Sequence, residues 1–220
     1  MQSDWLLILD FDGTVTTEDI AVQVLNAYAA PGWESHDDDY EAGRITLAEC
    51  IHRQFGMIRA SRETIRRFAR ERAVLRPGLR ELLAWCRERG VGLQILSAGL
   101  DVYIEAVLEC EGLVDAFDEV HCVRTEFIGD GLSCRLPELG ADSSANVDYK
   151  ASHVARLRAA GCKVAYAGDG STDRGAAAVA DRVFARASLL RYCREVGIPG
   201  IPFETFAEVS RDLQARLPAG

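Results

Sequence analysis

The sequence predicts an α/β protein, with a doubly wound parallel sheet and a small helical cap inserted after the first strand. From about residue 79 onward, short apolar runs alternate with segments of helical periodicity, and strands separated by helices favour a parallel sheet. Between residues 15 and 75 the apolar periodicity is helical throughout. We therefore expect a core of residues 1–14 and 76–220 and a cap of residues 15–75.

The first strand is predicted at the start of the chain. Trp5-Leu6-Leu7-Ile8-Leu9 has the length and apolar content of a buried strand, and Asp10-Phe11-Asp12-Gly13-Thr14 follows at once. Because strand side chains alternate between faces, Asp10 and Asp12 lie on the same side of the strand end. Two such carboxylates repel each other unless a cation lies between them, which favours a hard divalent ion such as Mg²⁺. An acidic turn is the alternative.

Three helices are predicted in the insert. One carries an apolar stripe from Ile20 to Tyr28 and is broken by a Pro-Gly pair at 31–32. The second runs from Ile45 to Phe55, with Thr46 as N-cap and Glu49 at the capping-box spacing. The third opens at Ser61, and an Arg-Pro-Gly sequence at 76–78 marks the return to the core. The acidic run at 37–39 is expected to be a loop or a helix start.

The core elements then follow in regular alternation. We expect strands at 91–96, 117–123, 163–167 and 183–185, and helices at 79–88, 102–110, 149–160, 173–180, 189–196 and 204–217. A hairpin is expected between residues 126 and 136, because Gly129-Asp130-Gly131 lies between apolar residues.

Polar residues also follow the later strands. Ser97-Ala98-Gly99 offers a hydroxyl and backbone amides before a helix, which suits a phosphate, although small residues also cap helices. Lys150 begins a helix, where its charge opposes the macrodipole and is better placed to bind an anion; a solvated charge is the alternative. Asp169 and Asp173 flank a glycine turn, which suits a metal ligand with a supporting acid, or a capped helix start. Open α/β sheets place their ligand crevice at such strand ends.

Composition excludes several classes of protein. The formal net charge of −9 over 220 residues, with no basic run, argues against nucleic-acid binding. We find no membrane-length apolar stretch and no basic-then-apolar leader. The seven cysteines are scattered, with no Cys-x-x-Cys pair, and indicate reduced thiols in a cytoplasmic protein.

The strand-end residues together resemble the four motifs of the haloacid dehalogenase superfamily, phosphatase branch. The four motifs are the pentapeptide at 10–14, Ser97, Lys150 and Gly168-Asp169-Gly170-Ser171-Thr172-Asp173, in the family's order. The resemblance implies a Rossmann-like core with its central strand at residues 5–10. It also implies that the insert is the small cap of phosphoserine-phosphatase-like members.

The same resemblance assigns roles to four acids. Asp10 would be the nucleophile that forms an aspartyl-phosphate. Asp12 would protonate the leaving alkoxide, then activate water, and would give its backbone carbonyl to Mg²⁺. Asp169 would be a metal ligand, and Asp173 would support the metal and its waters. The predicted metal set is therefore Asp10, Asp12, Asp169 and Asp173.

The phosphoryl group has its own predicted contacts. By the resemblance, Ser97 and Lys150 would hold its oxygens, with help from backbone amides near Phe11, Gly13 and Ala98. Mg²⁺ and Lys150 would neutralise the charge that otherwise prevents a carboxylate from attacking phosphorus.

The C-terminal segments 181–186 and 197–206 are similar to a narrower branch, the methionine-salvage phosphatases that act on 2-hydroxy-3-keto-5-methylthiopentenyl-1-phosphate. The stretch between Cys134 and Lys150 departs from that branch, because it lacks a cysteine-rich segment. Phosphoserine phosphatases carry an acid nine residues after the nucleophile, which Asp19 matches, and a cap arginine that aligns with His52, beside Arg53. These three cap residues are the predicted specificity residues; a solvated surface is the alternative.

We therefore expect a Mg²⁺-dependent phosphomonoesterase that acts on a small phosphorylated metabolite as a monomer or homodimer. A phosphotransferase or a phosphonate- or halide-cleaving enzyme of the same superfamily is one alternative, although Asp12 argues against a dehalogenase. A non-catalytic small-molecule binding protein on this fold is another, but it would lack at least one motif residue. Response-regulator receivers also pair strand-end acids with a lysine, but they have neither this insert nor a Gly-Asp-Gly-x-x-Asp turn.

Overall fold

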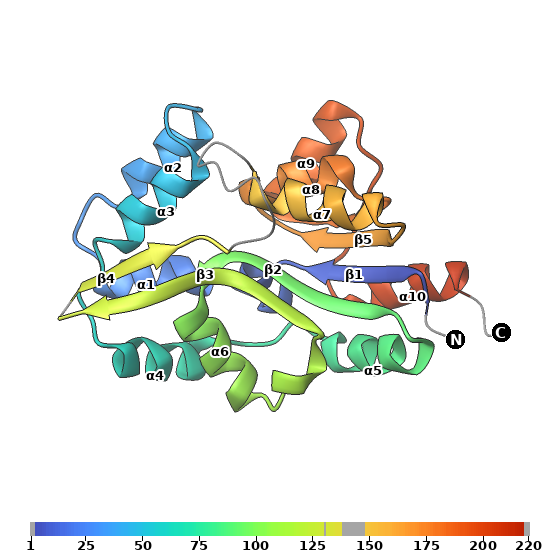
Figure 1. The fold of residues 1–220 in the computed structure, drawn as a ribbon, viewed down its shortest axis with the longest axis horizontal. Coiled ribbons are helices and arrows are strands. Elements are labelled where there is room, and N and C mark those ends of the chain that lie inside the picture. Colours follow the sequence, from blue (N-terminus) through green and yellow to red (C-terminus); the bar gives the residue numbers. More distant parts are fainter. Residues whose placement is uncertain (1–2, 130, 138–147, 218–220) are drawn as a thin grey trace.

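The computed structural model describes residues 3–129, 131–137 and 148–217, and a seven-stranded sheet forms its centre (Figure 1). The strand order is β4-β3-β2-β1-β5-β6-β7, and every neighbouring pair is parallel except β3–β4. The strands are β1 (Trp5–Leu9), β2 (Gly92–Leu100), β3 (Glu119–Ile128), β4 (Gly131–Arg135), β5 (Lys163–Gly168), β6 (Arg182–Ala185) and β7 (Gly200–Pro202). This arrangement confirms the predicted α/β class.

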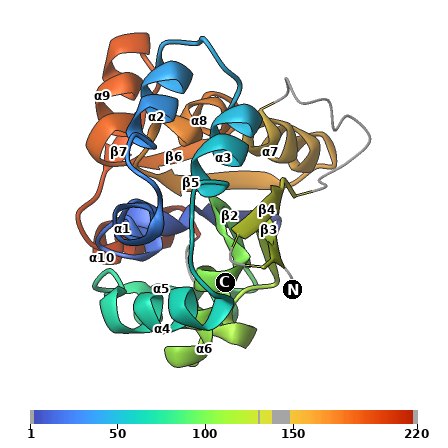
Figure 2. The same cartoon turned by 90° about the vertical axis from the view of Figure 1, so that its left-hand side faces the viewer.

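Helices cover both faces of the sheet (Figures 1 and 2). On one side lie α7 (Tyr149–Ala159), α8 (Arg174–Val179) and α9 (Ala187–Val196). On the other side lie α5 (Leu79–Arg89), α6 (Asp101–Cys110) and α10 (Phe206–Arg216), which packs against α5. The two helical layers exclude water from the middle strands, as a parallel sheet requires.

Strand β1 is central because its residues are apolar on both faces. Leu7, Ile8 and Leu9 are fully buried. Burying each such side chain stabilises the folded state by about 1.5–3 kcal/mol relative to leaving it exposed. The strand pairs with β2 on one side and β5 on the other. The carboxyl ends of these three strands therefore meet at one edge, where the chain places its acids.

The insert comprises α1 (Ile20–Tyr28), α2 (Glu34–Glu41), α3 (Leu47–Phe55) and α4 (Arg62–Arg72). The chain leaves and returns side by side, because Thr16 and Leu75 form an antiparallel bridge. Helices α2 and α3 stand on the α7–α9 side of the sheet, whereas α4 lies on the opposite side and packs against α6 (Figures 1 and 2). The insert thus shares its packing with the core, and a separate cap of residues 15–75 stays a prediction.

Most predicted elements are present, with three differences. Strand β2 continues to Leu100, so that the residues expected to follow the strand lie within it, beside an irregularity in its pairing with β3. The acidic run at 37–39 is part of α2. Strand β7 was not predicted, because a strand of three residues is too short to show a periodic pattern of apolar residues. In the β3–β4 hairpin, Asp130 lies outside the described residues, as do residues 138–147 of the stretch that departs from the methionine-salvage branch.

Local signals read from the sequence agree with the structure where they can be checked. Thr46 and Glu49 form the predicted capping box at the start of α3, and Ser61 caps α4. All seven cysteines are free thiols, five of them buried. None of the described helices is long and apolar enough to cross a membrane.

Candidate active site

A cavity of about 370 Å³ opens at the carboxyl ends of β1, β2 and β5. Its floor carries Asp10 and Asp12, the 97–99 segment of β2 and the 169–172 turn after β5, and its walls come from α1, α2 and α3. Three sequence segments that are far apart in the chain therefore share one cavity, because parallel strands end at the same edge.

Lys150 lies beneath this floor and joins two of the predicted acids. Its Nζ donates to Asp10 Oδ1 at 2.8 Å and to Asp173 Oδ1 at 2.7 Å, and the lysine is fully buried. Burial lowers the pKa of Lys150, but the two carboxylates more than reverse this and raise it well above its ordinary value. The lysine is therefore a permanent cation, not the solvated surface charge that was the alternative.

Asp173 acts through contacts that use both of its oxygens. Oδ1 accepts from Lys150 and from the Tyr166 hydroxyl at 2.6 Å, and Oδ2 accepts from the backbone amides of Asp169 and Gly170 at 2.9 and 3.0 Å. Four hydrogen bonds leave little capacity for a metal ion. Asp173 thus holds the turn and the lysine, in keeping with the predicted supporting role.

Asp10 and Asp169 supply the donor set for a hard cation. One ligand atom of each lies within 4.8 Å of the other, and both lie within the same distance of an oxygen of Asp173. Burial and the neighbouring acids raise the pKa of Asp10 well above its ordinary value, and burial and Asp173 raise that of Asp169 to about 7. A divalent cation would relieve this repulsion, and carboxylate oxygens are the ligands that Mg²⁺ prefers, so the residues fit this ion.

Asp12 is held differently. Its Oδ1 accepts from the backbone amides of Ile20 and Ala21 at 3.0 and 3.3 Å, and its Oδ2 accepts from the Tyr103 hydroxyl at 2.5 Å. Burial and the negative charge of Asp19 raise the pKa of Asp12 to about 8. A carboxyl group that keeps its proton at neutral pH, oriented by three donors, can serve as a general acid.

Two glycines make room for this arrangement. A Cβ on Gly99 would overlap the Tyr103 hydroxyl and the Asp12 carboxylate. Gly13 has a φ of +68°, and a Cβ there would overlap the Asp169 carboxylate. Because glycine has no Cβ, the backbone approaches the carboxylates of Asp12 and Asp169 more closely than a residue with a side chain would allow.

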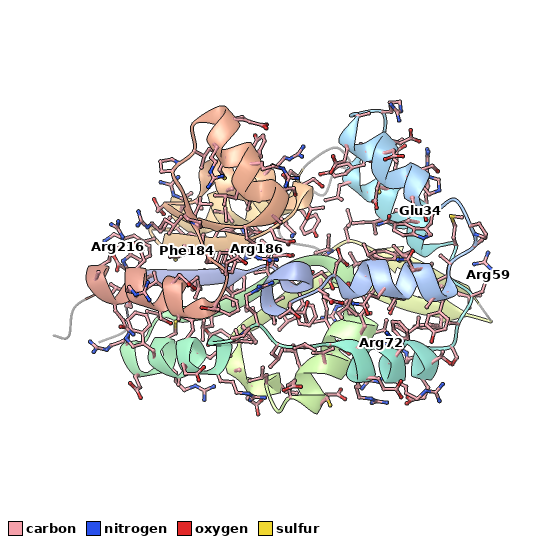
Figure 3. All side chains as sticks on the ribbon, turned by 180° about the vertical axis from the view of Figure 1, so that it is seen from behind. Glu34, Arg59, Arg72, Phe184, Arg186 and Arg216 are labelled. Carbon is pink, nitrogen blue, oxygen red and sulfur yellow. The ribbon has the colours of Figure 1, made fainter. Side chains whose placement is uncertain are left out.

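Two arginines fix the turn that carries Asp12. The buried Arg76 donates to the carbonyls of Gly13, Thr14 and Thr16 at 2.7, 2.8 and 3.1 Å. Arg186 also donates to the Gly13 carbonyl, at 2.8 Å, and lies beside the turn after β1 (Figure 3). These contacts restrain the backbone that presents the reactive side chains.

The predicted phosphate contacts are only partly free to bind an anion. Ser97 and Ala98 line the cavity, and Ser97 Oγ accepts from the Gly99 amide at 3.0 Å, which leaves its hydroxyl hydrogen to donate to an anion. The Gly13 amide already donates to the Glu18 carbonyl, at 3.3 Å, and Gly13 does not line the cavity. The Phe11 side chain is fully buried, and the contact of its backbone amide stays a prediction. The Ser97–Ala98 segment is therefore the better candidate for an anion contact.

Of the three predicted specificity residues, the structure brings only Asp19 to the cavity. It caps α1 by accepting from the Val22 amide at 2.8 Å, and burial of its surroundings raises its pKa. His52 and Arg53 lie on the exposed side of α3, so the expectation that one of them faces inward is corrected. At about 100° per residue, the inward positions are Ile51 and Gln54 instead.

The inner wall of the insert is acidic and apolar. Acids line it at Asp19, Asp37, Asp38 and Glu41, and among the described lining residues there is no Lys or Arg. Gln54 is nine-tenths buried and its Oε1 has no hydrogen-bond partner among the described residues. The apolar part of the wall consists of Val22, Leu25, Leu47, Ile51 and Phe55.

A family model described as haloacid dehalogenase-like hydrolase matches residues 7–178. The chain belongs to this family. It is similar to the 2-hydroxy-3-keto-5-methylthiopentenyl-1-phosphate phosphatases of Geobacillus kaustophilus (34% identity) and Brevibacillus brevis (31%), with 97% of each chain covered in both comparisons.

Solved structures with the same fold include phosphoserine phosphatases. A substrate-bound complex superposes with a TM-score of 0.72 at 14% identity, covering 96% of this chain and 99% of the other. The enzyme from T. onnurineus gives 0.69 at 18% identity, with 96% and 94% covered. These structures share the fold, and the family model together with the relatives at 31–34% identity confirms the predicted superfamily. The phosphatases among the relatives support a hydrolase of phosphoric monoesters.

Several residues of this haloacid dehalogenase-like site were not predicted from the sequence to be functional. Tyr103, Tyr166, Arg76, Arg186 and Gln54 each lie beside an apolar run or on a helix, where their types are common. Arg76 carried one signal, since it begins the Arg-Pro-Gly boundary. The others could be found only by seeing what their side chains contact.

Proposed function

We propose that this chain is a Mg²⁺-dependent phosphomonoesterase that works through an aspartyl-phosphate on Asp10. The observation that carries the proposal is the geometry of two acids on one floor. Asp10 accepts from the buried Lys150 at 2.8 Å, and Asp12 is oriented by Tyr103 and two backbone amides, with burial and Asp19 raising the pKa of Asp12 to about 8. One carboxylate is oriented for attack and the other is ready to donate, which is the division of labour that a two-step hydrolysis needs.

In the first step, an Asp10 oxygen forms a bond to phosphorus while the bond to the leaving oxygen breaks, and Asp12 transfers its proton to that oxygen. In the second step, Asp12 takes a proton from water as the water attacks phosphorus and Asp10 departs. Lys150 keeps Asp10 in place and offsets its charge throughout.

Asp10 and Asp169 would hold the ion, with Asp173 securing the turn; a ligand contribution from the backbone carbonyl of Asp12 remains a prediction. When bound, Mg²⁺ supplies positive charge between the attacking carboxylate and the phosphate.

We propose further that the leaving group carries no carboxylate. The four acids of the insert would repel a second anion, and no described lining residue offers a cation to it. The relatives' substrate, 2-hydroxy-3-keto-5-methylthiopentenyl-1-phosphate, has a neutral leaving group with hydroxyl, keto and methylthio functions. The unpartnered Gln54 Oε1 suits a hydroxyl donor, and the apolar wall suits the methylthio end. This compound is our first candidate.

The reaction class is tested with p-nitrophenyl phosphate. We expect EDTA to abolish hydrolysis, Mg²⁺ to restore it and Ca²⁺ not to, because Ca²⁺ accepts looser geometry. Hydroxylamine added during turnover should modify Asp10 alone, as detected by peptide mass spectrometry. Full turnover in chelator, or modification elsewhere, would contradict the proposal. Transfer of phosphate to an alcohol in preference to water would favour the phosphotransferase alternative.

The substrate class is tested with a matched pair, O-phosphoserine and phosphoethanolamine, which differ by one carboxylate. We expect kcat/KM to be at least about tenfold higher for phosphoethanolamine, and higher still for the relatives' substrate. Gln54→Leu should lower kcat/KM for the relatives' substrate but not for p-nitrophenyl phosphate, with Arg53→Ala as the matched control on the same helix. Preference for O-phosphoserine would rule out this substrate class without affecting the reaction class.

The cytoplasmic location, supported by seven free cysteines, and a monomeric or homodimeric state complete the proposal. Size-exclusion chromatography with light scattering would test the oligomeric state.

A further inference from the structure

A second group of potential metal ligands lies at the edge of the sheet. Glu119 and His121, two residues apart on β3, project from the same face, and His121 Nε2 is 2.6 Å from Glu119 Oε2. His153 of α7 packs against His121 with ring centroids 4.7 Å apart. One ligand atom from each of the three residues lies within 4.8 Å of the other two.

The buried member of this group is held in a defined orientation. His153 is fully buried, and its Nε2 is 2.8 Å from Oε1 of Gln94 on β2. Because that amide oxygen only accepts, Nε2 carries the proton and Nδ1 carries the lone pair. A histidine that binds a metal through one nitrogen characteristically donates from the other to a fixed acceptor. Gln94 supplies this acceptor.

The lone pair of His153 already attracts positive charge. Arg156 Nη2 lies 3.1 Å from Nδ1, and this arginine is exposed, so that it can move into solvent when a metal ion approaches. His121 also borders a second cavity, of about 390 Å³, which has room for water as a further ligand; Arg124 and Arg135 also line it.

We propose that Glu119, His121 and His153 form a second metal site, for Zn²⁺ or a similar divalent transition metal, at the sheet edge between β3 and α7. Two imidazoles and one carboxylate suit Zn²⁺ and are too rich in nitrogen for Mg²⁺, which separates this site from the one at Asp10. Tetrahedral coordination at about 2.0–2.2 Å sets ligand atoms about 3.3 Å apart, so small side-chain rotations within the cluster suffice.

The consequence is a cross-link between two elements of the core. Helix α7 carries Lys150 at its first turn and His153 one turn later, so a metal ion would tie the helix that positions Lys150 to strand β3. The site is structural in this proposal, and it does not depend on the proposed phosphatase activity.

The test uses the full-length, untagged protein and Zn²⁺ alone, titrated by calorimetry with Mg²⁺ present in excess. We expect one Zn²⁺ per chain, visible absorption typical of tetrahedral Co²⁺ when Co²⁺ replaces it, and a higher Tm with Zn²⁺. His121→Ala and Glu119→Gln should each weaken binding about tenfold or more and remove the Co²⁺ absorption. Both positions lie at the surface edge, and circular dichroism would check the fold.

Two control variants separate this site from other binding. His52→Ala removes an exposed histidine elsewhere, and Asp169→Asn removes a carboxylate of the Mg²⁺ cluster. Both should bind Zn²⁺ as the parent protein does. Absence of Zn²⁺ binding by the parent protein, or unchanged binding by both His121→Ala and Glu119→Gln, would overturn the proposal. Loss of binding in Asp169→Asn would instead assign the ion to the cluster at Asp10 and would equally overturn it.

Discussion

Replacing Asp12 by Asn removes a transferable proton while preserving the contacts of this side chain. The amide oxygen can still accept from Ile20 and Ala21, and the amide nitrogen can donate to Tyr103, which accepts as readily as it donates. The variant should therefore fold, and any loss of rate reports on chemistry.

The expected magnitude depends on the leaving group. A positioned general acid contributes about 10²–10⁴-fold, or about 3–5 kcal/mol of activation free energy. We expect kcat for an alkyl phosphate to fall by this amount in Asp12→Asn. The breakdown of the aspartyl-phosphate also uses Asp12 as a base, so the steady-state rate of p-nitrophenyl phosphate hydrolysis will fall as well. The rate of its single-turnover burst should fall by less than about tenfold, because p-nitrophenolate leaves without a proton.

The pH dependence gives a second readout. With burial raising the pKa of Asp12 to about 8, the group is about nine-tenths protonated at pH 7 and about one-tenth at pH 9. The rate of phosphoryl transfer from an alkyl phosphate should therefore decline above pH 8, and Asp12→Asn should lack this decline. Because the folded-state pKa lies above the unfolded value, the contribution of Asp12 to stability is full below about pH 4 and is lost as pH rises through 8. The Tm advantage of Asp12→Asn over the parent should therefore grow from pH 6 to pH 9.

The assays are rapid-quench kinetics with both substrates and thermal unfolding across the same pH range. Equal burst losses on the alkyl and aryl phosphates would refute the role of Asp12 as general acid. An alkaline decline that persists in the variant would assign the pKa near 8 to another group.

Three further changes test the geometry of the site. Gly99→Ala should lower kcat at least about 100-fold and destabilise the fold by about 1–3 kcal/mol, because its methyl group would overlap the hydroxyl that holds the general acid. Gly131→Ala, where a methyl group would meet no atom of the described, non-adjacent residues closer than 3.7 Å, should do neither in activity and denaturation assays. Arg76→Lys should lower the free energy of unfolding by about 2 kcal/mol or more in urea titrations, because a lysine cannot reproduce the buried hydrogen bonds to several carbonyls. As a control, Arg80→Lys on the exposed face of α5 should change this free energy by less than about 0.5 kcal/mol. Asp10→Asn should keep the fold and lose essentially all turnover in a phosphate-release assay, and activity within about tenfold of the parent would exclude Asp10 as the nucleophile.

The sequence by itself determined the fold class, the positions of most elements and the acids of the site. Strand β1 is apolar on both faces, which only a central strand of a covered sheet permits, and its sequence pattern shows this directly. The capping box at Thr46 and the Asp-rich turns are local signals with fixed spacing. Because parallel strands end at one edge, the motifs could be assigned to one crevice before any contact was known.

Only the tertiary structure decided which groups these acids contact. Lys150 could have been a solvated charge from its place in the sequence, and the fold buries it between Asp10 and Asp173. The inward face of α3 depended on its packing, which selects Gln54 over the neighbouring Arg53. A helical pattern fixes the angle between side chains but not the direction in which the helix is turned, because that direction is set by contacts with segments distant in the chain.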